Sequence, residues 1–164
     1  MSPRLLKGVL IALIVLLNIG CDQSTKYAAR ALLQDGDTIH LVGNILVLRY
    51  AENDGAFLSL GARLPKPVRM VSFIAFPIIA LCFIVGYIAR AKETSWAVIA
   101  GLSCIVGGGW GNLIDRLFRD GRVSDFINVG IGTVRTGIFN FADLSILIGC
   151  LLLVASPWKR ARTG

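Results

Sequence analysis

Residues 138–156 read IFNFADLSILIGCLLLVAS, and this predominantly apolar run contains one acid, Asp143. Between Asp143 and Lys159 lie 15 uncharged residues. As a helix they cover about 22 Å, which is short of the ~30 Å hydrocarbon core of a bilayer. A membrane span here must therefore carry Asp143 at or below the membrane surface. Acids in such places usually mark a transport pathway or a reaction site.

The rest of the chain is also too apolar for an ordinary soluble domain. Its 164 residues are 55% hydrophobic, and the mean hydropathy is +0.70. Three further uncharged runs occur, Gly8–Cys21, Met70–Ala89 and Thr94–Ile114. We therefore predict a membrane α-helical fold, a four-transmembrane-helix bundle forming one membrane-embedded domain over residues 1–164. The expected spans are residues 8–25, 68–89, 95–114 and 138–156.

The long connection between the first two spans predicts a small sheet. Residues 38–42 and 45–50 are rich in β-branched and other apolar residues, and Gly43-Asn44 between them is a turn signal. We expect an antiparallel β-cradle on the membrane face, over residues 35–62. Four glycines between residues 118 and 137 instead favour a mobile loop with one possible strand pair.

Alternating spans divide the connections between two sides of the membrane. The side holding both termini has seven Lys/Arg and one acid, and the other side has ten Lys/Arg and nine acids. Because the first group is far shorter, its basic residues lie more densely beside the spans, and we expect both termini to be cytoplasmic. The β-cradle is then periplasmic. Asp22, Asp115, Asp125 and Asp143 share that side under either orientation.

Composition excludes several classes of function. The four cysteines form no CxxC pair, and His40 is the sole histidine, so we expect neither a metal site nor a cofactor. The net charge of +7 comes from scattered basic residues rather than from an aromatic-interleaved patch. We therefore expect membrane lipid, and no nucleic acid, as the counterpart of this charge.

The N-terminal run also permits a different interpretation. Arg4 and Lys7 precede an apolar stretch that ends at Gly20-Cys21-Asp22, as in a lipoprotein signal peptide. Asn18 stands where such a peptide prefers a leucine-like residue, and three further spans follow. We therefore favour an uncleaved first span.

Polar residues gather at the predicted span ends. Asp22 and Lys26 are spaced i,i+4 and can pair on one helix face, either as a helix-end anchor or as part of a site. Asn53-Asp54-Gly55 supplies a turn and an amide able to hold an extended peptide, although an ordinary turn has the same pattern.

A second polar group ends the third span. Gly107 and Gly111 form a small-xxx-small pair that allows close helix approach. Asn112, Asp115 and Arg116 share one helical face, which packing alone does not explain. We interpret these three as a polar network.

Asp125 and Asp143 are the candidate catalytic residues. Each is flanked by an aromatic or apolar residue, a setting that raises the pKa of a carboxyl group by desolvation. Two carboxyl groups within a few ångströms would share one proton. The ionised member could activate water while the protonated member donates to a scissile carbonyl oxygen.

Five segments together resemble lipoprotein signal peptidase (signal peptidase II), an aspartyl intramembrane protease family. They are Asp22-Gln23-x-x-Lys26, Asn53-x-Gly55-Ala56, Gly111-Asn112-x-x-Asp115-Arg116, Val123-x-Asp125-Phe126 and Phe139-Asn140-x-Ala142-Asp143. The resemblance runs from about residue 5 to 158. It implies endoproteolytic removal of the signal peptide from diacylglyceryl-modified prolipoproteins, just before the lipidated cysteine, at the outer face of a bacterial cytoplasmic (inner) membrane.

The resemblance also assigns roles to residues. It makes Asp125 and Asp143 the catalytic pair. The substrate-binding or supporting residues would be Asp22, Lys26, Asn53, Gly55, Asn112, Asp115, Arg116 and Asn140. We expect a monomer.

The chain departs from the family pattern around the second segment. Glu52 stands where an aromatic residue is usual, Asp54 adds a negative charge that Arg49 or Arg63 could offset, and Phe57-Leu58 follow Ala56. These changes leave open a catalytically inactive relative that binds lipoproteins. An ion-coupled transporter that uses the membrane acids as proton sites is the other alternative.

Overall fold

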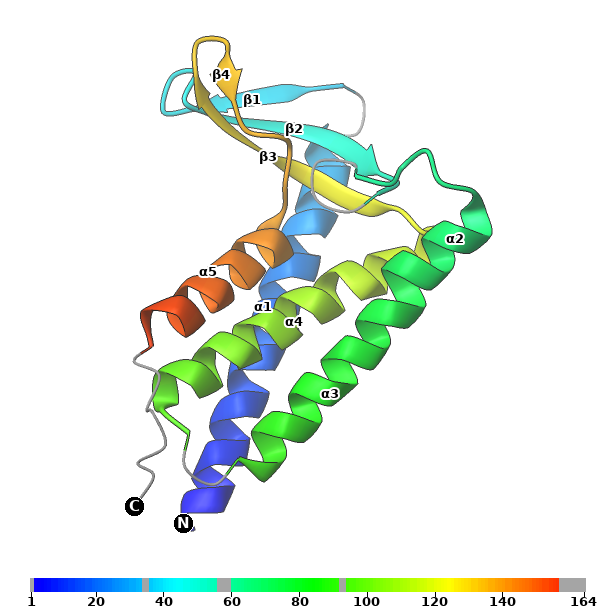
Figure 1. The fold of residues 1–164 in the computed structure, drawn as a ribbon. Coiled ribbons are helices and arrows are strands. Elements are labelled where there is room, and N and C mark those ends of the chain that lie inside the picture. The colour runs from blue at the N-terminus through cyan, green and yellow to red at the C-terminus, as the bar shows by residue number, and fades with distance from the viewer. Residues whose placement is uncertain (1, 34–35, 56–59, 92–93, 157–164) are drawn as a thin grey trace.

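The computed structural model describes residues 2–33, 36–55, 60–91 and 94–156. The helices lie side by side and a sheet crosses one end of them (Figure 1). In chain order the elements are α1 (Pro3–Leu33), β1 (Thr38–Leu41), β2 (Leu46–Asn53), α2 (Lys66–Met70), the π-helical turn η2 (Val71–Ala75), α3 (Phe76–Arg90), α4 (Trp96–Phe118), β3 (Val123–Ile131), β4 (Val134–Arg135) and α5 (Phe141–Ala155).

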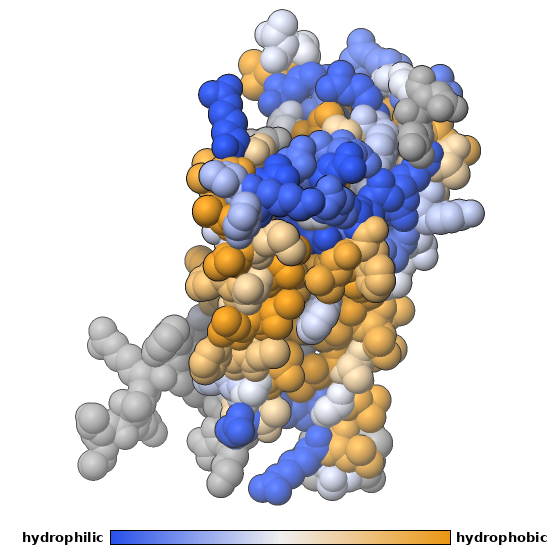
Figure 2. All heavy atoms as spheres, turned by 90° about the vertical axis from the view of Figure 1, so that its right-hand side faces the viewer, coloured by the Kyte–Doolittle hydropathy of each residue, from blue (hydrophilic) through white to orange (hydrophobic). Residues whose placement is uncertain are grey.

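Three helical segments in the described part of the chain are long and apolar enough to cross a membrane: Arg4–Leu33, Lys66–Arg90 and Trp96–Phe118. The fourth apolar helix, α5, is shorter. Viewed towards α2 and α3, hydrophobic residues form a belt over the helices, and hydrophilic residues gather at the sheet end (Figure 2). Large apolar side chains such as Phe83 and Val154 are more than three-quarters exposed. This surface suits lipid rather than water, as in a multi-pass membrane protein.

α4 is the central helix because its glycines allow neighbouring backbones to approach. A Cβ at Gly107 would lie 2.7 Å from the Cβ of Asn18 in α1, and one at Gly111 would lie 2.5 Å from Asp22 Oδ2. A Cβ at Gly108 would lie 2.5 Å from the carbonyl oxygen of Ala142 in α5. The predicted close approach through Gly107 and Gly111 is confirmed, and it brings α1 and α5 against the same helix.

The sheet has the order β1-β2-β3-β4, with antiparallel neighbours. The predicted hairpin is confirmed. Gly43 and Asn44 are the central residues of its turn, and Gly43 has φ +64°. The prediction of a mobile loop over residues 118–137 is wrong, since β3 there is nine residues long, but the possible strand pair within it is present as β3 and β4. Gly130 lies near the end of β3 and Gly132 in the following turn, while Gly121 precedes β3 and Gly137 follows β4, so the glycines do not interrupt the pairing of β3 with β2.

The helix that contains the first predicted span, residues 8–25, extends beyond that span. α1 continues to Leu33, and Asp22 and Lys26 therefore lie within it. Its last turns carry Ala29 and Leu33, which pack with Phe126 of β3 in a small core. This apolar contact explains the extension, because the end of α1 supports the sheet. Cys21, the acceptor cysteine of the cleaved-signal interpretation, lies inside the same continuous helix.

Candidate active site

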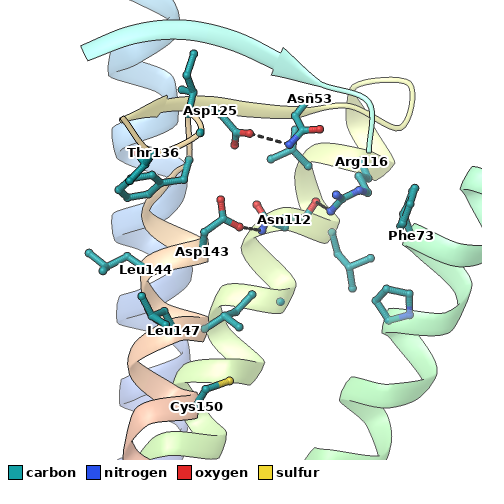
Figure 3. A pocket seen from close by; sticks show the side chains of 18 residues that line it. Asn53, Phe73, Asn112, Arg116, Asp125, Thr136, Asp143, Leu144, Leu147 and Cys150 are labelled. Carbon is teal, nitrogen blue, oxygen red and sulfur yellow. Dashed lines mark hydrogen bonds between the residues drawn. The ribbon is translucent and has the colours of Figure 1, made fainter. Parts of the chain in front are cut away.

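Asp125 and Asp143 come from two different elements and face the same space. Asp125 lies in β3, opposite Ala51 of β2, and is 3% exposed. Asp143 lies in the first turn of α5. Their side chains point into one pocket, from the sheet and from the helix respectively (Figure 3). The structure thus brings together the two carboxyl groups that the sequence singles out.

Asn140 joins the two acids. Its Nδ2 donates to Asp125 Oδ1 at 2.7 Å, and its backbone N–H donates to Asp143 Oδ2 at 3.1 Å. Its Oδ1 accepts from the backbone N–H of Asp143 at 3.0 Å, which completes a capping box at the start of α5. Asn140 is fully buried. A cap that satisfies the first turn of the helix therefore also fixes the position of both carboxyl groups.

Asn112 holds the other oxygen of Asp143. Its Nδ2 donates to Asp143 Oδ1 at 2.9 Å, and its Oδ1 accepts from Asn140 Nδ2 at 3.1 Å. The polar network predicted at the end of α4 is therefore present, and it reaches α5.

Asn53 and Arg116 organise the turn that follows β2. Asn53 Nδ2 donates to Asp125 Oδ2 at 3.0 Å, while its Oδ1 accepts from the backbone N–H of Gly55 at 2.9 Å. Arg116 Nη2 donates to the Gly55 carbonyl oxygen at 2.7 Å. We expected the Asn53 amide to hold an extended peptide, whereas in this structure it orients Asp125. Ala56, Phe57 and Leu58 lie outside the described residues.

Asp22, Lys26 and Asp115 form a buried charged cluster beside these groups. Lys26 Nζ lies 2.8 Å from Asp22 Oδ2 and 3.5 Å from Asp115 Oδ2, and Lys26 and Asp22 are fully buried. The predicted i,i+4 pair is confirmed. Asp22 Oδ1 also accepts from the backbone N–H of Ala142 at 2.9 Å. The cluster therefore ties α1 to the first turn of α5.

The surroundings of Asp125 change its acidity. Burial, reinforced by the negative charge of Asp143, raises the pKa of Asp125 from 3.8 to about 6. Hydrogen bonds from Asn53 and Asn140 and the charge of Lys26 act in the opposite direction. Desolvation prevails, so Asp125 holds its proton at a pH where an exposed aspartate has lost it.

The pocket that contains both acids has a volume of about 610 Å³. Asp125, Asp143, Asn53, Asn112 and Arg116 line its polar part. Apolar residues of η2, α3, α4 and α5 line the rest, including Phe73, Pro77, Leu113, Leu144, Leu147 and Cys150 (Figure 3). A ligand with a polar peptide end and an apolar segment matches this division.

The model of the family described as signal peptidase (SPase) II matches residues 14–159. This chain belongs to the signal peptidase II family.

The relatives agree with this assignment. A lipoprotein signal peptidase from Borrelia hermsii (strain HS1 / DAH) is 35% identical over 90% of this chain and 87% of its own length. Another, from Halothermothrix orenii (strain H 168 / OCM 544 / DSM 9562), is 28% identical over 94% of this chain and 99% of its length. A solved bacterial membrane enzyme, determined by the in meso method at 1.9 Å resolution, superposes with a TM-score of 0.78. It is 30% identical, and the match covers 91% of this chain and 92% of that one.

As a member of the signal peptidase II family, the chain is an aspartic-type protease that removes signal peptides from lipoprotein precursors. The comparisons do not favour the transporter or the inactive relative. The geometry is consistent with a protease, since two carboxyl groups share one pocket and are hydrogen-bonded through Asn140.

The two acidic departures from the signal peptidase II pattern, Glu52 and Asp54, have clear partners. Glu52 binds Arg119 at 2.7 Å and also pairs with Arg122. Asp54 pairs with Arg69 of α2 at 3.2 Å, so the expectation of Arg49 or Arg63 is wrong. The start of α2 lies beside the end of β2, so Arg69 reaches Asp54 although the two residues are not close in sequence. Both acids lie in surface ion pairs rather than in the pocket.

Sequence reasoning missed Gln23, Ser124 and the apolar residues that line the pocket, such as Phe73. Gln23 Nε2 bridges Asp22 Oδ2 at 3.0 Å and the Gly111 carbonyl oxygen at 3.1 Å. Ser124 donates its backbone N–H to Asp115 Oδ2 at 2.8 Å. The position of Gln23 within a family motif, and that of Ser124 next to Asp125, could have indicated that both belong to the site. Phe73 lies in an apolar run, and nothing in its sequence context indicates that it lines the pocket.

Proposed function

We propose that Asp125 and Asp143 are the catalytic pair with which this enzyme hydrolyses diacylglyceryl-modified prolipoproteins just before the lipidated cysteine. The observation that carries the proposal is the double attachment of Asn140, which holds both carboxyl groups in one pocket. The raised pKa of Asp125 makes this residue the protonated member of the pair. Asp143 is the member that takes the proton from water; its two oxygens accept hydrogen bonds from Asn112 Nδ2 and from the Asn140 backbone N–H.

The reaction then follows from the two protonation states. Asp143 takes a proton from water as the oxygen attacks the scissile carbonyl carbon, and Asp125 gives its proton to the carbonyl oxygen. The resulting tetrahedral intermediate breaks at its C–N bond. Asp143 passes its proton to the departing nitrogen, and Asp125 recovers one from a hydroxyl group of the intermediate. The products are a carboxylic acid and a free amine, and the pair returns to its starting state.

The supporting residues keep this geometry. Asn53, Asn112 and Asn140 each donate to a catalytic carboxyl group. Arg116, through Gly55, holds the turn at the pocket edge. Positioning of this kind accounts for a large part of many enzymes' acceleration.

We further propose that the chain forms a single domain with four spans, α5 being the short one, and that both termini are cytoplasmic. The hydrophilic sheet end then lies at the periplasmic face of the inner membrane, and the precursor's apolar segment reaches the pocket from the lipid. Water is available at that boundary. We also propose that the enzyme acts as a monomer.

The test is cleavage of a diacylated precursor peptide by purified protein, followed by gel shift. Asp125→Asn and Asp143→Asn should each lower kcat at least 10³-fold, about the effect of removing an essential acid–base group. Asp120→Asn is the matched control, because Asp120 pairs with Lys66 on the surface, 66% exposed. If the Asp125→Asn/Asp143→Asn double variant turns over at a rate near that of the wild type, the proposal is wrong.

A further inference from the structure

Lys26 is completely buried, yet it does not line the pocket of the catalytic pair. Its ammonium has three N–H donors and three nearby acceptors. Nζ lies 2.8 Å from Asp22 Oδ2, 3.0 Å from Asn112 Oδ1 and 3.5 Å from Asp115 Oδ2. Lys26 could neutralise Asp22 and Asp115 without contacting an amide. Its hydrogen bond to Asn112 therefore indicates a second role for Lys26.

The amide of Asn112 can in principle adopt two orientations, related by exchange of its oxygen and nitrogen. In the structure Oδ1 accepts from both Lys26 Nζ and Asn140 Nδ2, and Nδ2 donates to Asp143 Oδ1. A flipped amide would set its N–H groups against an ammonium and another amide donor. It would also set its oxygen against a carboxylate. The charged donor from Lys26 therefore acts together with Asn140 and Asp143 against the flipped form.

We propose that Lys26 is a positioning residue that acts on the catalytic pair through Asn112, by fixing the amide so that it donates to Asp143. The inference rests on the proposed catalytic roles of Asp125 and Asp143. It links a charge in α1 to a carboxyl group in α5 through one side chain of α4.

The charge of Lys26 also acts on Asp125, whose pKa it lowers. Four elements contribute the groups that surround this charge. They are Asp22 of α1, Asp115 and Asn112 of α4, Asp125 of β3, and Asn140 and Asp143 of α5, with Arg30 beyond Asp115 at 4.0 Å. Removal of the Lys26 charge raises the pKa of Asp125, so the alkaline limb of the rate profile moves to higher pH.

A double-mutant cycle in the purified full-length enzyme tests the inference. Lys26→Met should lower kcat about 10- to 100-fold with little change in KM, the effect of misplacing a reacting group. Asn112→Ala should lower kcat similarly. Because Lys26 acts through Asn112, the Lys26→Met/Asn112→Ala variant should be no slower than Asn112→Ala alone.

A second variant separates positioning from folding. Lys26→Met leaves two buried carboxylates with less compensation and can unfold the protein. Asp22→Asn/Lys26→Met removes one charge of each sign, and the asparagine keeps the oxygen that accepts from Ala142. Rates are expressed per folded protein. Lys7→Met is the matched control, since Lys7 caps the end of α3 at Ile88 and Ala91, far from the pocket.

Loss of kcat in both Lys26 variants, together with a non-additive cycle, would support the inference. An unchanged kcat in Asp22→Asn/Lys26→Met, or fully multiplicative losses in the cycle, would overturn the inference about Lys26. The proposed function would still stand in that case, provided that Asp125→Asn and Asp143→Asn are inactive. Activity in those two asparagine variants would instead overturn the proposed function itself.

Discussion

Asn140 offers the most informative single perturbation, because one side chain both caps α5 and bonds to both members of the proposed catalytic pair. Asn140→Ala removes the oxygen that accepts from the Asp143 backbone N–H and the amide that donates to Asp125 and Asn112. Loss of an N-cap costs about 1 kcal/mol. Leaving buried polar partners unsatisfied costs about 1–3 kcal/mol more. The free energy of unfolding should therefore fall by roughly 2–4 kcal/mol.

Asn140→Ser divides the two roles. A serine oxygen can still accept from the Asp143 backbone N–H, so about 1 kcal/mol of capping is retained. It is too short to replace the amide that donates to Asp125. We therefore expect the serine variant to be more stable than the alanine variant, with kcat at least about 100-fold below that of the wild type in both.

Thermal unfolding in detergent, followed by tryptophan fluorescence, measures the stability of each variant. Cleavage of a diacylated precursor measures its kcat. Wild-type kcat in Asn140→Ser would refute the view that the amide positions the pair. Equal stability of Asn140→Ala and the wild type would refute the capping argument.

Three further predictions follow from the same contacts. Asn53→Ala removes a hydrogen bond that lowers the pKa of Asp125, so the alkaline limb of kcat/KM against pH should move to higher pH; an unchanged profile would contradict this. Because the pKa of Asp125 in the folded protein is about 6, above its ordinary 3.8, the protonated group contributes stability that is complete below about pH 4 and lost as pH rises through 6. Unfolding of Asp125→Asn should lack this decline, as a comparison of melting temperatures at pH 4 and pH 7 will show. Gly108→Ala places a Cβ 2.5 Å from the Ala142 carbonyl oxygen and should destabilise the protein by about 1–3 kcal/mol through displacement of α5. Gly8→Ala adds a Cβ with no atom within 4 Å of it, in the interior of α1, and should not lower the melting temperature.

Much of the site could be predicted from local patterns. The i,i+4 pair of Asp22 and Lys26 and the shared face of Asn112, Asp115 and Arg116 follow from helical periodicity, which needs no tertiary information. The hairpin with its Gly43-Asn44 turn follows from alternation and turn chemistry.

Other features could not be predicted locally. β3 forms because β2 offers an edge with which residues 123–131 can pair, and that pairing joins segments about 75 residues apart. Asp54 meets Arg69 for a similar reason, since the chain bends back into α2 between them. The extension of α1 depends on the sheet against which Leu33 packs.

The amino-acid sequence by itself determined the apolar helical character of the protein and its family, and it singled out Asp125 and Asp143. These properties depend on composition, on the spacing of residues and on the order of the motifs, none of which requires a folded chain. Only the tertiary structure decided that Asp125 and Asp143 share a pocket, that Asn140 bonds to both, and that Lys26 reaches Asn112. The physical reason is that hydrogen bonds and desolvation act over a few ångströms, and the close packing of α1, α4 and α5 sets those distances.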